Sequence, residues 1–148
     1  MSKDISISKK SRSEKETIEI ANRFARRLKS GDVVFLYGQL GSGKSVFVRG
    51  ALTGLGYRKG TVRSPSFTLM REYTVNGLAI YHIDLYRLDT PQELMQMGYR
   101  EYFYNPDGIV FVEWADKVEG MDVDAFHVKI DYVDLTTRSI TIKSNHLS

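Results

Sequence analysis

The 148-residue chain contains no cysteine. This absence excludes a disulfide framework, a metal site built from thiolates and a cysteine nucleophile. The chain also has no apolar run long enough to span a bilayer, and residues 1–16 hold no apolar core of signal-peptide length. We therefore expect a soluble, cytoplasmic protein with no membrane partner.

Repeats, linkers and low-complexity segments are also lacking, and 42% of the residues are hydrophobic. A chain of this size can bury a substantial core, so we expect a single domain over residues 1–148. The net charge of +3 is unevenly distributed, because residues 1–30 hold nine Lys and Arg against four Asp and Glu, a net +5 that leaves −2 elsewhere. A nucleic-acid or partner surface is one explanation, and a solvated helix face, which we favour, is the other.

The N-terminal part of the chain predicts an amphipathic helix as the first element. Ser13 followed by Glu16 fits a capping box, and apolar residues recur at helical spacing from Ile18 to Leu28. Gly31 then supplies a stop signal for this helix.

An alternation of strand and helix patterns follows. Asn76-Gly77 separates two strand patterns and is a strong signal for an antiparallel hairpin. The Thr-Pro-Gln-Glu segment beginning at Thr90 predicts a helix through Met97, and the segment NPDG at 105–108 predicts a turn. The remaining expected elements are a helix that begins at residue 45 and ends at Gly54 or Gly56, and strands at 32–38, 67–75, 78–84, 108–114, 126–132 and 139–143.

Residues 38–45, GQLGSGKS, match the phosphate-binding pattern GxxxxGK[ST] and join a predicted strand to a predicted helix. Glycines let backbone N–H groups converge on phosphates, the lysine reaches them, the hydroxyl meets Mg²⁺, and the helix adds its positive N-terminal end. A plain glycine turn would not explain a Lys-Ser pair at this place. The predicted nucleotide-binding residues are Gly38, Gln39, Leu40, Gly41, Ser42, Gly43, Lys44, Ser45 and Val46, and Lys44 is also assigned a catalytic role.

The P-loop and the element pattern together predict the fold class. Strands 32–38 and 108–114 are continuous apolar runs, as expected of strands buried on both faces of a sheet. We expect an α/β protein with a three-layer P-loop NTPase-type fold, in which a mixed central sheet includes the antiparallel hairpin.

A P-loop needs an acid beside its magnesium ion, usually at the end of a neighbouring apolar strand. Asp84 follows LAIYHI and Glu113 follows GIVFV. We assign Glu113 to the metal together with Ser45, because its strand is the more continuously apolar, and Asp84 to the orientation of water. For either acid alone, a carboxylate that caps a turn is an equally good explanation.

Three other features have weaker interpretations. Segment 62–69, VRSPSFTL, occupies the place of a phosphate-sensing loop in many P-loop proteins, although an ordinary entry into a strand would look the same. For His82 we favour a structural or hydrogen-bonding role over catalysis. For Trp114, the only tryptophan, we favour packing.

The segments GQLGSGKS, VRSPSFTL, HIDLYRL at 82–88 and VEWAD at 112–116, in this order, resemble the TsaE family, the P-loop ATPases of bacterial tRNA threonylcarbamoyladenosine synthesis. The similarity runs from about Gly31 to Asp116. It implies a small Mg²⁺-dependent ATPase that joins the TsaD–TsaB threonylcarbamoyl transferase and meets tRNA indirectly, through that complex. Such a protein supports repeated turnover and does not itself make the threonylcarbamoyl bond.

The resemblance also implies roles for single residues. Ser45 and Glu113 would bind Mg²⁺, Asp84 would serve hydrolysis, and Arg138 would approach the nucleotide from the late strands. The chain departs from the family pattern at four positions, Gln39, Ser45, Val46 and Ser66. Ser45 and Ser66 keep the hydroxyl, whereas Gln39 and Val46 remove side-chain oxygens near the phosphates and bear on nucleotide affinity.

Three alternatives stay open at this point. A guanine-nucleotide switch would need an NKxD-type motif, which the chain lacks, so ATP is favoured over GTP. A small-molecule kinase would need an arginine-rich lid and a substrate pocket. A nucleotide-gated binding module with incidental hydrolysis fits the absence of a recognisable arginine or glutamine finger; Arg63, Arg71 and Arg87 are not placed by their spacing.

Overall fold

The computed structural model describes residues 5–39, 41–58, 62–63, 70–86, 91–96, 98–115 and 124–144. The strands are β1 Ser6–Ser11, β2 Val33–Tyr37, β3 Val62–Arg63, β4 Met70–Val75, β5 Leu78–Asp84, β6 Gly108–Glu113, β7 Phe126–Tyr132 and β8 Arg138–Ser144. The helices are α1 Glu14–Ala25, α2 Lys44–Gly54, α3 Pro91–Gln96 and α4 Tyr99–Phe103. Among the described helices, none is long and apolar enough to cross a membrane.

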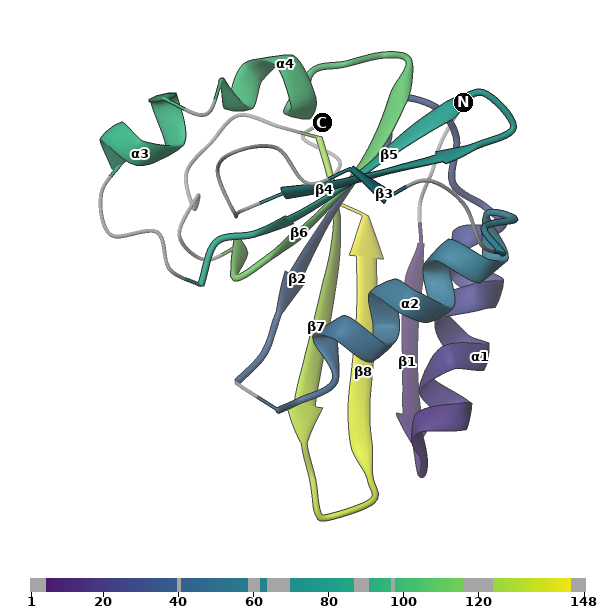
Figure 1. The fold of residues 1–148 in the computed structure, drawn as a ribbon. Helices are drawn as coiled ribbons and strands as arrows, with labels where there is room; N and C mark the ends of the chain where they lie inside the picture. Colours follow the sequence, from purple (N-terminus) through teal and green to yellow (C-terminus); the bar gives the residue numbers. More distant parts are fainter. Residues whose placement is uncertain are drawn as a thin grey trace.

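All eight strands form one sheet in the order β1-β8-β7-β2-β6-β5-β4-β3 (Figure 1). The central strands β7, β2, β6 and β5 run parallel, whereas β1, β8 and the β4–β3 end pair antiparallel with their neighbours. The predicted mixed sheet is therefore confirmed.

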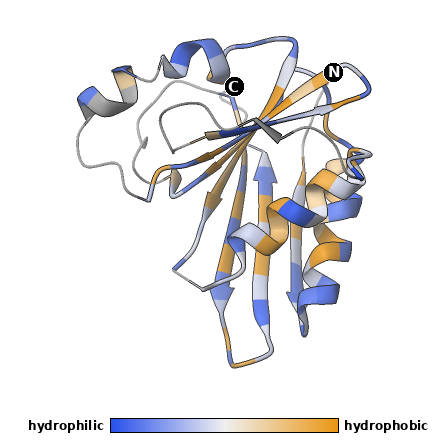
Figure 2. Cartoon of the chain, viewed as in Figure 1, coloured by the Kyte–Doolittle hydropathy of each residue, from blue (hydrophilic) through white to orange (hydrophobic). Residues whose placement is uncertain are grey.

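Helices cover both faces of the sheet, which makes three layers. Figure 1 shows α1 and α2 on one side and α3 and α4 on the other. The first side holds a large apolar cluster that includes Phe24, Phe47 and Phe111, and the second holds a smaller cluster around Phe35 and Phe103. Strands β2 and β6 contribute to both clusters, and Figure 2 shows them as largely hydrophobic. Their continuous apolar sequences follow from this position, because both faces of each strand are buried.

The hairpin predicted at Asn76-Gly77 is present. Val75 pairs with Leu78 across a two-residue turn, and Asn76 and Gly77 have φ angles of 51° and 82°. Positive φ at both positions is the requirement of a type I′ turn, which Asn-Gly meets at little cost. The predicted helix from Thr90 to Met97 is observed as Pro91–Gln96, and its two outer residues lie outside the described part.

The predicted end of the first helix was wrong. α1 begins with Ser13 as N-cap, whose Oγ accepts the N–H of Glu16, as the capping box requires. The helix ends at Ala25, however, and not at Gly31. After Ala25 the chain tightens into three-residue turns, with Leu28 N–H bonded to Ala25 O, so that Leu28 stays buried although it is no longer helical.

The prediction that this helix is the first element was also wrong. Strand β1 precedes it and pairs antiparallel with β8 along its whole length, from Ser6↔Lys143 to Ser11↔Arg138. Only Ile5, just before the strand, and Ile7 show apolar alternation there, because β1 is an edge strand in which Lys9 and Lys10 are exposed and the one fully buried residue, Ser11, is polar. The short helix α4 and the two-residue strand β3 were likewise not predicted.

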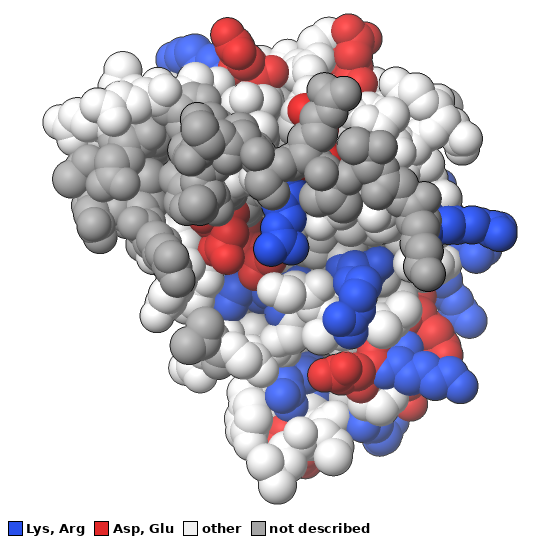
Figure 3. Space-filling view, viewed as in Figure 1, with Lys and Arg blue, Asp and Glu red and all other residues white. Residues whose placement is uncertain are grey.

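The basic residues of the N-terminal region lie on the exposed surface of β1 and α1. Lysines and arginines gather on the right-hand side of the molecule in Figure 3, and acidic side chains are interspersed among them. Mixed charges on an exposed face are typical of a solvated helix.

Two glycines let α2 approach α1 closely. A Cβ on Gly50 would lie 2.7 Å from both Cα and O of Ile18, and one on Gly54 would overlap the backbone of Asn22. These distances are shorter than a Cβ atom tolerates, so α1 and α2 can cross this closely only because Gly50 and Gly54 have no side chain. Because α2 carries the P-loop lysine and serine at its first turn, this contact also places the site.

Gly50→Ala is expected to destabilise the protein by about 1–3 kcal/mol, because overpacking against the Ile18 backbone exceeds the gain of roughly 1 kcal/mol in helix propensity. Urea denaturation followed by circular dichroism measures the change. Arg49→Ala, on the exposed face of the same helix, is the control and should stay within about 0.5 kcal/mol of wild type. If Gly50→Ala had a higher free energy of unfolding than wild type, α1 and α2 could move apart to accommodate the methyl group without loss of stability.

Candidate nucleotide-binding site

Residues 38–39 and 41–43 lie between β2 and α2, and their backbone depends on glycine. Gly41 and Gly43 have φ angles of 80° and 110°, which side chains disfavour. A Cβ on Gly38 would lie 2.5 Å from Ser42 Oγ and 2.6 Å from Ile130 O. The turn therefore has the strand-to-helix geometry expected of a P-loop. Leu40 lies outside the described residues.

The ammonium group of Lys44 is folded back onto this turn. Nζ donates hydrogen bonds to Gly38 O at 2.6 Å and to Gln39 O at 3.0 Å, and lies 4.1 Å from the centre of the Trp114 ring. Lys44 is buried, so these carbonyls and the aromatic face replace water around the charge. Trp114, for which packing was favoured, thus packs against a residue of the predicted site.

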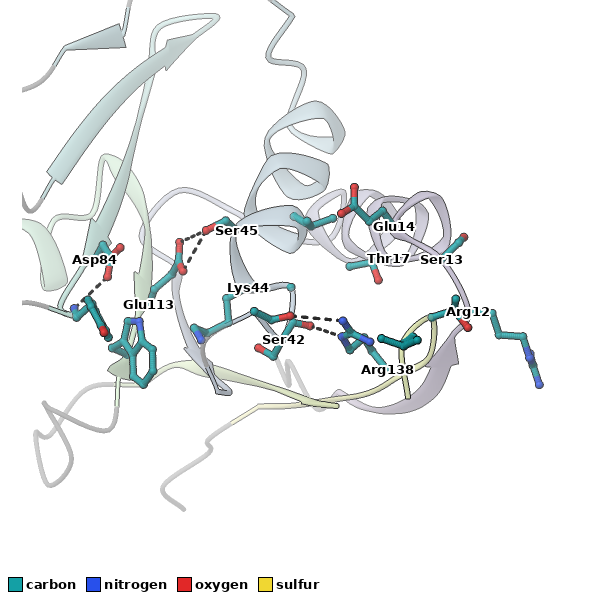
Figure 4. A pocket seen from close by; sticks show the side chains of 17 residues that line it. Arg12, Ser13, Glu14, Thr17, Ser42, Lys44, Ser45, Asp84, Glu113 and Arg138 are labelled. Carbon is teal, nitrogen blue, oxygen red and sulfur yellow. Dashed lines mark hydrogen bonds between the residues drawn. The ribbon is translucent and has the colours of Figure 1, made fainter. Parts of the chain in front are cut away.

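Glu113 ends β6 and faces the first turn of α2. Ser45 Oγ donates to its carboxylate at 3.2 Å and 3.3 Å (Figure 4). His82 Nε2 lies 2.5 Å from Glu113 Oε2. The sheet brings these side chains together, because β2, β6 and β5 run parallel and Leu36 and Asp84 are both in register with Glu113. The carboxyl ends of parallel strands meet at one edge, where ligands bind.

The pKa of Glu113 reflects competing influences. Burial raises this pKa, since the side chain is only 5% exposed, but the hydrogen bond and charge interaction with His82, the Ser45 hydroxyl and the Lys44 charge lower it by more. The net pKa lies below the ordinary carboxyl value. Glu113 is therefore ionised at neutral pH and presents a carboxylate beside the Ser45 hydroxyl.

Asp84 is exposed at the end of β5, and its Oδ1 accepts the N–H of Tyr86 at 3.0 Å. This contact is the turn-capping role that strand-end aspartates commonly have. Asp84 also lines the same pocket as Glu113, Lys44 and Ser45, and its role in orienting water stays a prediction.

Arg138 links the start of β8 to the P-loop. Its Nε donates to Ser42 O at 3.0 Å and its Nη2 to Gly41 O at 3.4 Å, and Figure 4 shows the side chain pointing toward this turn. Its Nη1 donates to Asp134 O and Thr137 O at 2.7 Å and 3.0 Å. The structure thus brings Arg138 to the predicted site, and a direct contact with nucleotide stays a prediction.

The pocket around these residues has a volume of about 580 Å³, which is in the usual range for small-molecule sites. It extends from Asp84, Glu113 and Trp114 past the P-loop to the N-terminal end of α1 and the start of β8. One polar group in its wall has no hydrogen-bond partner among the described residues: Ser42 Oγ, in a residue that is 1% exposed. A buried hydroxyl of this kind is costly unless a ligand or water satisfies it.

The comparisons with known proteins agree with this geometry. The family model described as "Threonylcarbamoyl adenosine biosynthesis protein TsaE" matches residues 11–140. The chain belongs to the TsaE family.

Relatives named tRNA threonylcarbamoyladenosine biosynthesis protein TsaE include those of Haemophilus influenzae, 48% identical over 103 residues, and Bacillus subtilis, 42% identical over 104 residues. These alignments cover 69% and 70% of this chain but 64% and 63% of the relatives, slightly less than two thirds of their length. The TsaE protein of Rickettsia conorii is 32% identical over 90% of this chain and 76% of its own.

A crystal structure of YdiB from Bacillus subtilis is similar to the whole described fold. It matches with a TM-score of 0.77 and 30% identity, over 97% of this chain and 88% of the other. The resemblance to the TsaE family and the P-loop NTPase-type fold class, both predicted from the sequence, are confirmed.

Sequence reasoning missed the far end of this TsaE-family pocket, where Arg12, Ser13 and Thr17 line the wall. The turn between β1 and α1 places them, because Ser11 Oγ lies 2.7 Å from Thr17 Oγ1 and donates to Ser13 O at 2.8 Å. The Ile5/Ile7 alternation could have indicated β1 and hence this turn. No local signal indicated that Leu135 and Thr136 also line the pocket.

Gln39 and Val46 both belong to the described residues, and their effect on nucleotide affinity stays a prediction. Gln39 is exposed and contributes its carbonyl to Lys44, and the side chain of Val46 lines the pocket. The loop at 64–69, including Ser64, Ser66 and Thr68, lies outside the described residues, as does Arg87.

His82→Ala is expected to raise the pKa of Glu113, because the burial that raises it remains while the largest lowering contacts are lost. In wild type, the stability from ionised Glu113 is present above the ordinary carboxyl pKa of 4.5 and is lost as pH falls through the lowered pKa. The variant should therefore lose less unfolding free energy below pH 4.5. Carboxyl NMR titration and urea denaturation between pH 3 and 7 measure both effects.

His127→Ala is the control, since His127 contacts Tyr37 on another part of the sheet. It should leave the pKa of Glu113 unchanged. An unchanged Glu113 pKa in His82→Ala would mean that His82 has only a packing role.

Proposed function

We propose that this TsaE-family chain binds ATP with Mg²⁺, hydrolyses it to ADP and phosphate, and acts with a TsaD–TsaB threonylcarbamoyl transferase in tRNA modification. The observation that carries the proposal is the contact of Glu113 with Ser45 at 3.2 Å, directly beside the P-loop lysine. The names of the relatives place the family in tRNA threonylcarbamoyladenosine biosynthesis. TsaD and TsaB as partners, and tRNA reached indirectly through them, belong to the proposal.

The donor set fits Mg²⁺ and a nucleotide. Among the described residues there is no group of three or more His, Asp or Glu that could hold a metal. Mg²⁺ does not need one, because it commonly takes one or two protein oxygens, several waters and phosphate oxygens. Ser45 Oγ and the Glu113 carboxylate supply such oxygens, and the unsatisfied Ser42 Oγ is suited to a phosphate oxygen.

Each residue has a role that follows from its position. When bound, Mg²⁺ neutralises charge on the phosphates. Lys44 and the N–H groups of the P-loop hold the phosphates in place, and Glu113 and Ser45 hold the metal. Asp84 orients the attacking water and accepts its proton as the bond between the β–γ bridging oxygen and the γ phosphorus breaks. The phosphoryl group passes to water, and ADP leaves.

The contacts of the two cations support slow hydrolysis by the isolated chain. Lys44 Nζ is bonded to two P-loop carbonyls, and all three nitrogens of the Arg138 guanidinium donate to carbonyls. In this arrangement both cations are held by backbone carbonyls, and each would have to leave them to act on a γ-phosphate as an arginine finger does. A partner that rearranges these contacts or adds a cation would accelerate the reaction.

A nucleotide-gated binding module is the second candidate, and the same contacts favour it. If hydrolysis is incidental, nucleotide binding alone would control attachment to the partner. The two candidates differ in whether turnover of ATP is needed for repeated tRNA modification.

Lys44→Ala is expected to weaken ATP binding or turnover about 100-fold, because a buried cation beside the phosphates is lost.

The two acids should differ in their effects. In Glu113→Gln, ATP hydrolysis should lose most of its dependence on Mg²⁺, whereas Asp84→Asn should keep ATP affinity and hydrolyse ATP about 100-fold more slowly. Calorimetric binding and phosphate release measure the two quantities. Arg49→Ala removes an equal charge from an exposed position on α2 and should match wild type; a normal rate for Asp84→Asn would remove Asp84 from the mechanism.

Purified TsaD and TsaB are expected to raise the ATPase rate of this protein at least tenfold at saturation. In multiple-turnover tRNA modification, wild type should sustain repeated cycles and Lys44→Ala should stop after about one. Unchanged ATPase with saturating partner would refute activation. Repeated cycles driven by ATP-bound Asp84→Asn would favour the binding module.

A further inference from the structure

The end of β7 and the turn that leads to β8, residues 131–137, expose an unusual amount of apolar surface. Tyr132, Val133 and Leu135 are 53%, 49% and 87% exposed. They are three of the six large hydrophobic residues that are exposed in the described part of the chain. We call residues 131–137 the β7–β8 tip. It projects from the body of the protein in Figure 1, is partly hydrophobic in Figure 2, and forms a largely uncharged protrusion in Figure 3.

Grouped exposed apolar side chains indicate an interaction site more than scattered ones do. The β7–β8 tip is also held rigidly for so exposed a turn. Asp134 Oδ1 accepts the N–H groups of Thr136 and Thr137 at 3.0 Å and 2.9 Å, and Thr137 O accepts the N–H of Val133 at 3.1 Å. These hydrogen bonds lower the pKa of Asp134 and keep it charged. A turn fixed in advance loses little entropy when a partner binds it.

The tip is connected directly to the nucleotide pocket. Arg138 binds carbonyls of the tip with Nη1 and carbonyls of the P-loop with Nε and Nη2, and its guanidinium lies 4.7 Å from the Tyr132 ring. Leu135 and Thr136 line the edge of the pocket. A protein bound to the tip would therefore lie beside the part of the pocket lined by Leu135 and Thr136, and it could change the hydrogen bonds between the tip and Arg138.

The charge of the tip indicates the kind of partner. Residues 131–137, DYVDLTT, contain two aspartates and no lysine or arginine, in a chain whose net charge is +3. A complementary surface would have an apolar recess for Val133 and Leu135 with positive charge at its rim. A nucleic-acid backbone, which is negative, does not fit.

We propose that the β7–β8 tip inserts into an apolar recess with a positive rim on the protein partner, and that Arg138 transmits this contact to the P-loop. The identity of the partner, TsaD–TsaB, rests on the proposed function. The tip then explains how partner binding and the nucleotide site affect each other, because Arg138 donates hydrogen bonds to carbonyls of both the tip and the P-loop.

The test is the affinity of full-length variants for purified TsaD–TsaB, measured by biolayer interferometry with ATP and Mg²⁺ present. Val133→Asp should weaken binding at least tenfold, as expected for a charge placed in an apolar contact, and Val133→Ser by a smaller factor. Val133 does not line the pocket, so ATP affinity and the rate without partner should match wild type. Met95→Asp is the matched control, since Met95 is 69% exposed on α3, and it should bind TsaD–TsaB as wild type does.

The other outcomes overturn the inference in distinguishable ways. Wild-type affinity of Val133→Asp would show that the tip is not the docking element while leaving the partnership intact. An equal loss in Met95→Asp would show that the effect is not local to the tip. Leu135→Ser that loses more affinity for ATP than for TsaD–TsaB would assign the apolar tip to the nucleotide. Failure of wild type to bind TsaD–TsaB would remove the proposed partner and this docking site together.

Discussion

The buried carboxylate of Glu113 is the group on which the arrangement of the site depends. Its residue is only 3% exposed, and a charge in such a place is costly unless neighbours compensate for the lost water. His82, Ser45 and Lys44 supply that compensation, and they come from β5 and from the first turn of α2. They can meet only if β5, β6 and β2 lie side by side and in parallel, as they do. The Glu113 carboxylate is therefore stabilised only when this strand order and the position of the P-loop are both correct.

Sequence patterns predicted the parts of the site that strand ends and glycines determine. Glu113 and Asp84 end apolar strands, and parallel strands bring such ends together, so the sequence was enough to place both acids at one edge of the sheet. The P-loop could be placed because its positive φ angles require glycine. The edge strand β1 contains one apolar residue, Ile7, and only Ile5 just before it continues the alternation, so local pattern did not reveal the strand. The helix stop at Gly31 was wrong because tight turns, and not glycine, end α1 at Ala25.

The residues that no pattern revealed are those brought in by tertiary contacts. Thr17 reaches the pocket through a hydrogen bond with Ser11, and Leu135 reaches it because β8 returns beside β7. Trp114 was visible as a lone tryptophan, but its contact with Lys44 depends on a backbone φ of 59°, which sequence does not show. A bulky residue in that conformation costs of order 1–3 kcal/mol, so the surrounding contacts must hold it there.

The resting contacts of Lys44 and Arg138 have a common consequence. Each cation is held by carbonyls of the P-loop itself, Gly38 and Gln39 for the lysine and Gly41 and Ser42 for the arginine. Phosphate oxygens compete for the lysine, because a charged acceptor binds an ammonium group more strongly than a neutral carbonyl does. The arginine differs, since its remaining nitrogen is bonded to the β7–β8 tip, so that its release breaks contacts with two elements instead of one. Redirecting Lys44 therefore changes contacts of the P-loop alone, whereas redirecting Arg138 also removes two hydrogen bonds from the tip. Of the two cations, only Arg138 joins the P-loop to the tip through its hydrogen bonds.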